Sequence, residues 1–173
     1  MAIRLAARLF LAVGVCTLTL GSFSADLFAA DKTAGAELSS AISQAKLFAG
    51  LTDKEKAALE SAASLRHGKK GERIIEQGKS SGKMFVVLEG QAEVRVNGKP
   101  VATLPEQSLV GEIEFLDGPP ASGDVALSKD TNLIVLDNAV LGDLMKKQPR
   151  IGYVLMSEIA KIEARRLKAM NTK

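Results

Sequence analysis

Apolar residues follow a helical spacing at both ends of the main body of the chain and a period of two between them. Near the start of this body, Thr52 and Glu55 form a capping-box pattern at the beginning of an apolar helical repeat. The pattern predicts a helix over residues 53–63. From Leu65 onward the spacing changes to that of β-strands, so a β region is expected to follow the helix.

The central part of the chain has the pattern of short strands separated by glycine-centred turns. The predicted strands cover residues 73–76, 83–89, 91–96, 101–104, 124–128 and 132–136. Asn97 and Gly98 lie between two of them and favour a hairpin, because both residues tolerate positive φ. Residues 111–116 interrupt the strand pattern and predict a short helix. Many short strands with tight turns indicate an antiparallel sandwich or barrel.

The C-terminal part returns to a helical pattern. Asn138 is expected to cap a helix over residues 139–147, which Pro149 ends. Residues 151–170 then form an amphipathic helix whose apolar stripe either packs on the β region or pairs with a second copy of the chain in a homodimer. The basic residues near the end of this helix, interpreted as a solvated tail, are Lys161, Arg165, Arg166 and Lys168.

The N-terminus has the three parts of a secretory signal. Arg4 and Arg8 are followed by an apolar run over residues 9–20 and by small residues, with a predicted cleavage after Ser24 and a less well matched alternative after Ala29. This run is shorter than the about 20 residues that a membrane span needs. We therefore expect an exported protein, periplasmic or secreted, with anchoring by an uncleaved N-terminal segment as the alternative.

The chain of 173 residues is long enough for one domain with a short extension. Residues 1–24 are predicted to be the signal peptide. Residues 25–46, rich in Ala, Ser and Gly, are predicted to be a linker or a weak helix, and residues 47–170 to be the domain.

Composition argues against several classes of function. The one cysteine, Cys16, lies in the predicted signal peptide, and His67 is the one histidine, so neither a cysteine or histidine metal site nor a Ser-His or Cys-His catalytic pair is expected. Aromatic residues make up 4% and the net charge is +3, which gives no footprint for nucleic acid. Only seven residues follow Arg166, so no DNA-binding domain is expected. We expect a protein that is not an enzyme and has no cofactor.

The order of these elements, together with three motifs, resembles the cyclic nucleotide-binding domain. Residues 71–78 (GERIIEQG) and 84–94 (MFVVLEGQAEV) are similar to the family's strand motifs, and residues 111–113 (GEI) to the start of its phosphate-binding cassette. The resemblance covers residues 47–168. It implies a fold that is mainly β with flanking helices, a double-stranded β-helix or jelly-roll barrel followed by two C-terminal helices. We call residues 111–124 the cassette segment.

The resemblance also implies a ligand, cyclic AMP or cyclic GMP, and the residues that would bind it. Glu112 would accept the ribose 2′-hydroxyl, and Gly111 and Ile113 would supply cassette backbone. Ala121 stands where the family has the arginine that holds the phosphate, and Ser122 follows as a candidate phosphate donor. A charge-assisted hydrogen bond contributes about 1.5–3 kcal/mol, so its loss predicts binding roughly tenfold to a hundredfold weaker.

Two hypotheses follow for the function. The first is a regulatory, ligand-sensing module that binds a cyclic nucleotide or another small anion weakly and signals to an unknown protein partner. The second is a structural or protein-interaction module on the same fold with no small ligand, favoured by Ala121 and by the expected export. Lys79, Lys83 and Lys129 are the candidates for a replacement cation in the first.

Overall fold

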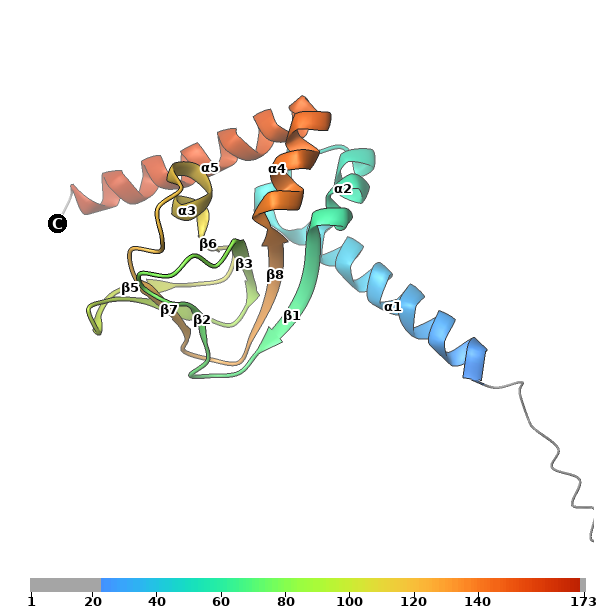
Figure 1. Ribbon diagram of the computed structural model, residues 1–173, viewed down its shortest axis with the longest axis horizontal. Helices are drawn as coiled ribbons and strands as arrows, with labels where there is room; N and C mark the ends of the chain where they lie inside the picture. Colours follow the sequence, from blue (N-terminus) through green and yellow to red (C-terminus); the bar gives the residue numbers. More distant parts are fainter. Residues whose placement is uncertain (1–22, 172–173) are drawn as a thin grey trace, which may run out of the picture.

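The structure, a computed structural model, describes residues 23–171, with side chains from residue 33 onward. Within these residues, eight strands form two four-stranded antiparallel sheets, and helices precede and follow them (Figure 1). The strands are β1 (Ala63–Gly68), β2 (Arg73–Ile75), β3 (Lys83–Glu89), β4 (Ala92–Val96), β5 (Lys99–Leu104), β6 (Leu109–Val110), β7 (Asp124–Leu127) and β8 (Thr131–Asp137). The sheet orders are β1-β8-β3-β6 and β2-β7-β4-β5.

The helices lie at one end of the barrel and across the face of the first sheet (Figure 1). They are α1 (Phe23–Gln44), α2 (Asp53–Leu59), α3 (Glu112–Asp117), α4 (Asn138–Lys147) and α5 (Pro149–Met170), with short 3-10 turns at Lys46–Phe48 and Glu60–Ala62. From its start beside α4, α5 runs past α3, which brings the C-terminal end of the chain to the cassette segment.

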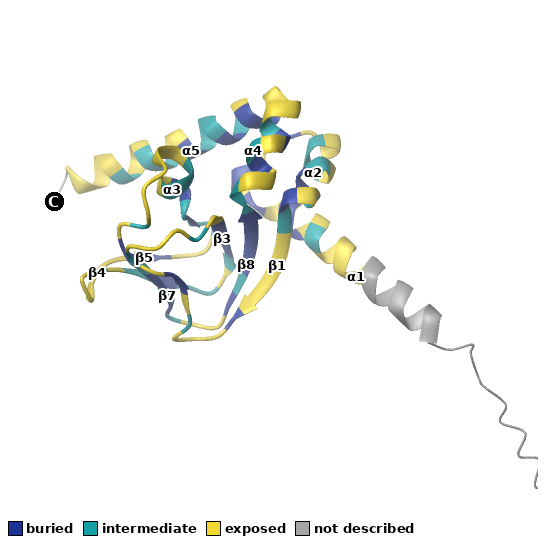
Figure 2. Cartoon of the chain, in the orientation of Figure 1, coloured by how far each residue is buried: buried dark blue, intermediate teal, exposed yellow. Residues whose placement is uncertain are grey.

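Side-chain alternation along β3 divides the core into two parts. Met84 and Val86 point toward the helices, whereas Phe85 and Val87 point toward the second sheet. Strand β8 alternates in the same way, so both strands are buried on both faces, as the dark colouring of β8 in Figure 2 shows. The predicted mainly β, jelly-roll barrel with C-terminal helices is confirmed.

The predicted hairpin is confirmed, because Asn97 and Gly98 both have positive φ, 51° and 76°. Two strands, β1 and the two-residue β6, have no counterpart among the predicted strand ranges, although the predicted change to β spacing at Leu65 falls within β1. The helix expected over residues 53–63 ends at Leu59, and β1 begins at Ala63. Since β1 is an edge strand and is largely exposed, even at Leu65, it carries little apolar alternation to detect.

Of the two alternatives predicted for residues 25–46, the structure shows the helix and not the linker. Residues up to Gln44 are helical in α1, and Ala41, Ile42 and Ala45 are buried in the core between the helices and the first sheet. The small residues that suggested a linker instead allow the last turns of α1 to pack closely. The domain therefore begins before the expected boundary at residue 47.

The C-terminal helices follow the prediction with one correction. Asp137, not Asn138, caps α4, because its carboxylate accepts hydrogen bonds from the backbone of Ala139 and Val140, both at 3.0 Å. Pro149 separates the two helices by occupying the first turn of α5. The apolar stripe of α5 packs on the domain, with Ile151 buried in the helical part of the core. Pairing of this helix with a second copy stays a prediction.

The predicted signal peptide falls mostly outside the described residues, as does Cys16. Among the helices of residues 23–171, none has both the length and the apolar content that crossing a membrane requires. Export and its alternative, an uncleaved anchor, stay predictions.

Candidate functional site in the cassette segment

The cassette segment starts with a glycine that the local geometry requires. Gly111 has φ 85°, and a Cβ there would lie 2.4 Å from the carbonyl oxygen of Lys83 and 3.2 Å from Cα of Met84. A larger residue is excluded by both the positive φ and the contact with β3. The glycine thus lets the chain leave β6 and start α3 directly against the barrel.

Glu112, the first residue of α3, is the buried acid of this site. It is 4% exposed, while its neighbour Ile113 is 46% exposed. Its Oε1 accepts a hydrogen bond from the Arg166 guanidinium at 2.5 Å. Arg166 also bonds to Glu163 at 2.8 Å and to the backbone carbonyl of Leu109, so it ties α5 to both β6 and α3.

The second oxygen of the Glu112 carboxylate, Oε2, is buried without a hydrogen-bond partner in the described part of the chain. Burial raises the pKa of Glu112 above its ordinary value, although the Arg166 charge opposes this shift. A buried acceptor without a donor is costly, and native proteins keep few of them. The carboxylate is therefore ready to accept a hydrogen bond from a ligand.

Glu114 lies two residues after Glu112 in α3, and both of its carboxylate oxygens have hydrogen-bond partners. Its carboxylate accepts hydrogen bonds from the Ser81 backbone at 2.9 Å, the Ser81 hydroxyl at 3.1 Å and the Gly82 backbone at 2.9 Å. Slight burial opposes ionisation, but these hydrogen bonds outweigh it and hold the pKa of Glu114 below its ordinary value. An ionised carboxylate thus fixes the loop between β2 and β3 against α3.

The far end of the cassette segment lies against the second sheet and the loop between β2 and β3. Ala121 donates to the carbonyl of Lys79 at 3.2 Å and accepts from the Gly78 backbone at 2.8 Å, and its methyl group packs on the barrel core. Ser122 is exposed, and no described residue bonds to its hydroxyl. A Cβ at Gly123 would lie 2.8 Å from the carbonyl of Arg95, so this end also packs closely on β4.

Two of the lysines proposed as a replacement cation lie near the cassette segment. Lys79 lines a cavity of about 530 Å³ beside β2 and is paired with Glu76 at 3.0 Å. Lys83 lines a second cavity, of about 500 Å³, together with Glu114 and Asp137. Neither of these two cavities is lined by the five residues predicted for ligand binding, which are Gly111, Glu112, Ile113, Ala121 and Ser122.

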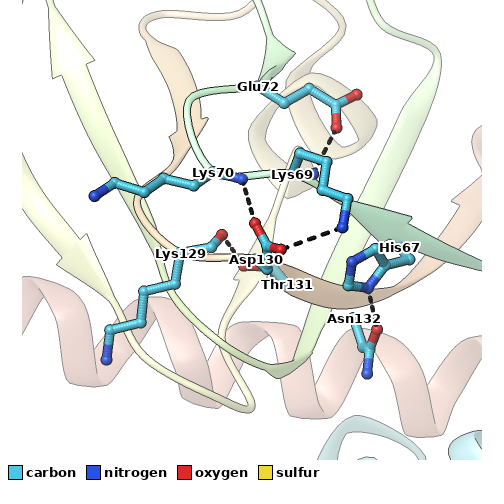
Figure 3. Close-up of polar contacts among 8 residues, drawn as sticks. All are labelled: His67, Lys69, Lys70, Glu72, Lys129, Asp130, Thr131 and Asn132. Atoms are coloured by element: carbon cyan, nitrogen blue, oxygen red, sulfur yellow. Dashed lines mark hydrogen bonds and ion pairs between the residues drawn. The ribbon is translucent and has the colours of Figure 1, made fainter.

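Lys129, the third candidate, lies at the other end of the barrel in the turn that joins β7 to β8 (Figure 3). Together with the turn that joins β1 to β2 and the adjoining strand ends, this turn forms a group of polar residues. We call this group the turn cluster, and its members are His67, Lys69, Lys70, Glu72, Lys129, Asp130, Thr131 and Asn132. Asp130 accepts from the Lys70 backbone at 2.8 Å and pairs with the Lys69 ammonium at 3.2 Å. These two contacts hold the pKa of Asp130 below its ordinary value. Its place at the end of the barrel opposite the cassette segment excludes Lys129 as the replacement cation.

The described residues contain no group of three or more His, Cys, Asp and Glu side chains placed to hold a metal ion. The candidate groups that remain are the Glu112 carboxylate and the exposed Ser122 hydroxyl, and no contact among the described residues joins the two.

Sequence reasoning missed Arg166 as a part of this site. The signal that points to it is its position on α5. Arg166 follows Ile159 and Ile162 at helical spacing, so it lies on the side of α5 that faces the domain. A basic residue in line with an apolar stripe has a partner on the surface that the stripe covers, and that partner here is Glu112.

Comparison with known proteins agrees with this architecture. Residues 65–148 match the model of a family described as "Cyclic nucleotide-binding domain". A cAMP-dependent protein kinase regulatory subunit from Mycosarcoma maydis is 31% identical over 90 residues, which are 50% of this chain and 17% of that protein. The chain thus corresponds to a small part of this relative.

Solved structures show the same fold. A cyclic nucleotide-binding domain from Methylobacillus flagellatus superimposes with a TM-score of 0.67 at 21% identity, covering 81% of each chain. A regulatory subunit of a cAMP-independent protein kinase A from Trypanosoma cruzi, bound to guanosine, has a TM-score of 0.56 at 23% identity and covers 65% of this chain and 41% of its own. Residues 65–148 of this chain therefore belong to the cyclic nucleotide-binding domain family.

Proposed function

We propose that this chain is a non-catalytic, ligand-sensing regulatory module, with weakened affinity for cyclic nucleotides, in which the cassette segment binds a small ligand that carries a ribose. The observation that carries this proposal is the Glu112 carboxylate, 4% exposed and with one oxygen unpartnered. A ribose hydroxyl is a donor of the right chemistry for that oxygen, and a charge-assisted hydrogen bond of this kind contributes about 1.5–3 kcal/mol.

The contact between Glu112 and Arg166 supplies a way to report ligand binding. Arg166 is the residue through which α5 bonds to α3 and β6. A ligand hydroxyl that shares the Glu112 carboxylate weakens or redirects its bond with Arg166, and the end of α5 then shifts relative to the barrel. A partner protein that contacts α5 would sense this shift.

Weakened affinity for cyclic nucleotides is supported by Ala121. Its side chain packs on the barrel core and has no group that can bind a phosphate. Among proteins of this fold, the Trypanosoma cruzi regulatory subunit is bound to guanosine, so the fold by itself does not determine that the ligand contains a cyclic phosphate.

The alternative is a structural or protein-interaction module that binds no small ligand. The bond between Arg166 and Glu112 favours it, because the carboxylate already has a cationic partner. The two functions differ in what a ligand does to the thermal stability of the domain.

A thermal-shift titration of the purified chain tests the proposal. Ligand that binds the folded state raises the Tm with concentration. We expect at least one compound among adenosine, guanosine, cyclic AMP and cyclic GMP to raise the Tm, and Glu112→Ala to weaken its binding roughly tenfold to a hundredfold. Glu37→Ala, the same change at an exposed acid of α1, is the control and should bind as the natural chain does. No shift with any of the four at millimolar concentration would establish the alternative.

A further inference from the structure

The cassette segment is strongly acidic. Between positions 111 and 124 the chain has four acidic residues and no lysine, arginine or histidine. The acids are Glu112, Glu114, Asp117 and Asp124. The hydrogen bonds from Ser81 and Gly82 keep Glu114 ionised, so the negative charge of the segment is present at neutral pH.

Cations from neighbouring elements are already engaged by carboxylates. Arg166 is bound to Glu112 and to Glu163. Arg73 of β2 lies 3.5 Å from Asp124. A phosphate that recruited either arginine would have to displace a carboxylate and leave that carboxylate without its partner.

The two lysines nearest the segment are no better placed. Lys79 is paired with Glu76, and Lys83 shares its cavity with Glu114 and Asp137. Lys83 is the one of these cations for which no ion pair is found among the described residues, and the two carboxylates of its own cavity offset its charge. Placing a ligand anion among the four acids of the segment therefore adds repulsion that Lys83 alone does not compensate. The segment therefore disfavours a charged phosphate.

The same groups are well suited to hydroxyl donors. An ionised carboxylate accepts hydrogen bonds and donates none. The Oε2 of Glu112 is such an acceptor, buried and without a donor in the described part of the chain. A nucleoside presents free 2′, 3′ and 5′ hydroxyls and no charge. In a cyclic nucleotide the phosphate takes up the 3′ and 5′ oxygens, which leaves the 2′ hydroxyl as the single ribose donor and adds a negative charge.

From these charges and contacts we infer that the preferred ligand of the cassette segment is an uncharged nucleoside rather than a cyclic nucleotide. The inference rests on the proposed function, that this segment binds a ribose-bearing ligand through Glu112. It adds the chemical class of that ligand. Base identity is set by contacts of the base, so the same preference is expected for adenosine over cyclic AMP and for guanosine over cyclic GMP.

Calorimetric titration of the full chain at about 0.15 M salt tests this with the two nucleosides and their cyclic nucleotides as paired ligands. We expect the better nucleoside to bind at least tenfold more tightly than its own cyclic nucleotide. Tighter binding of the cyclic nucleotide would overturn the inference and leave the proposed function standing. Binding of neither compound in both pairs would overturn the proposed function as well.

Two variants change the charge that the inference depends on. Ala121→Arg adds a cation at the end of the segment and should improve cyclic nucleotide binding at least tenfold without improving nucleoside binding. Ala57→Arg, at an exposed position on α2, is the matched control for the added charge and should change neither affinity.

Glu114→Gln is the second charge variant, and it tests the inference if Ala121→Arg disturbs packing on the barrel core. The amide keeps one oxygen to accept the hydrogen bonds from Ser81, loses the acceptor of the Gly82 backbone N–H and removes the charge. The ratio of nucleoside to cyclic nucleotide affinity should then fall severalfold. An unchanged ratio in both variants would show that charge does not select the ligand, and would overturn the inference.

Discussion

The two ends of the barrel satisfy their carboxylates in different ways. In the turn cluster, Asp130 has a backbone donor and an ammonium partner, and Glu72 accepts from the Lys69 backbone at 3.1 Å and pairs with Arg66. In the cassette segment, Glu112 is more deeply buried and yet has one oxygen without a partner. The pKa of Asp130 is lowered by its partners, whereas that of Glu112 is raised by burial.

This difference separates a polar cluster whose carboxylates are fully partnered from the segment for which we propose ligand binding. Each of the two carboxylates of the turn cluster is held by donors from the cluster and its neighbours, which fixes the turns and leaves neither carboxylate with an unpartnered oxygen (Figure 3). The cassette segment instead keeps a desolvated acceptor that protein groups satisfy only in part. Incomplete satisfaction of a buried group, rather than charge alone, is the reason for proposing the cassette end as the ligand-binding one.

The largest effect is expected from replacing the glycine that starts the cassette segment. Gly111→Ala should destabilise the domain by about 3 kcal/mol, because positive φ costs about 1–2 kcal/mol and contact of the new methyl group with the Lys83 carbonyl adds about 1–3 kcal/mol. Gly118→Ala is the control, since Gly118 has φ 89° but nothing lies within 4 Å of its Cβ position. Urea unfolding should show only the φ cost there. Equal losses in the two variants would show that the close contact with β3 contributes nothing.

Gly90 provides the equivalent test at the turn cluster. It has φ 99°, and a Cβ there would lie 2.5 Å from the carbonyl of Asp130. Gly90→Ala should therefore destabilise the domain about as much as Gly111→Ala, by about 3 kcal/mol in urea unfolding. Only Gly111→Ala should also weaken ligand binding, since Gly90 lies at the other end of the barrel. Loss of ligand binding in Gly90→Ala would contradict the separation of the two ends.

The next largest effect is expected from removing the partner of the buried acid. Arg166→Ala leaves Glu112 buried without a cation and should cost about 2–3 kcal/mol in urea unfolding. Arg165→Ala, at the neighbouring exposed position, is the matched control and should be close to neutral. If both variants lose the same stability, the pair between Arg166 and Glu112 does not hold α5 to the cassette segment.

Opposite pKa shifts give the two ends opposite dependence on pH. The pKa of Glu112 is raised in the folded state, so its contribution to stability is present below about pH 4 and is lost as the pH rises through the raised value. The pKa of Asp130 is lowered, so its contribution is present above about pH 4 and is lost as the pH falls.

Urea midpoints measured from about pH 3 to about pH 7 test this contrast. Glu112→Gln should remove part of the decline in stability toward neutral pH, and Asp130→Asn part of the decline in stability toward acid pH. Changes with the same sign in both variants would contradict the contrast.

The sequence is sufficient to predict the parts of this fold that strand alternation and turn chemistry define. The limits of β3 agree with the predicted strand, and the hairpin at Asn97 follows from the backbone preference of its two turn residues. The limits of strand β1 could not be predicted, although the change to β spacing was placed within it at Leu65, because an exposed edge strand has no buried side to impose alternation. The last turns of α1 were missed because small residues suit both a linker and a close helix contact.

The candidate site was predictable only in part. Gly111 and Glu112 belong to a motif of adjacent residues, and a motif of this kind can be found from the sequence alone. The bond between Glu112 and Arg166 joins residues 54 positions apart, so it depends on how α5 crosses the barrel. The hydrogen bond from the Ser81 backbone to Glu114 is also a tertiary contact, and no local sequence pattern predicts it.

The smallest effect is expected at the turn cluster. Lys69→Ala should leave the Tm nearly unchanged, because the pair with Asp130 is exposed to solvent and such pairs contribute little. Asp130 keeps its hydrogen bond from the Lys70 backbone in that variant, so the turn retains its main restraint. Asp130→Ala removes both contacts and should lower the Tm more than Lys69→Ala does, with ligand binding unchanged in both. The opposite result would be a loss of stability in Lys69→Ala as large as that in Arg166→Ala. The ion pair of the exposed Asp130 would then contribute as much to stability as that of the buried Glu112, and the distinction between the two ends of the barrel would be lost.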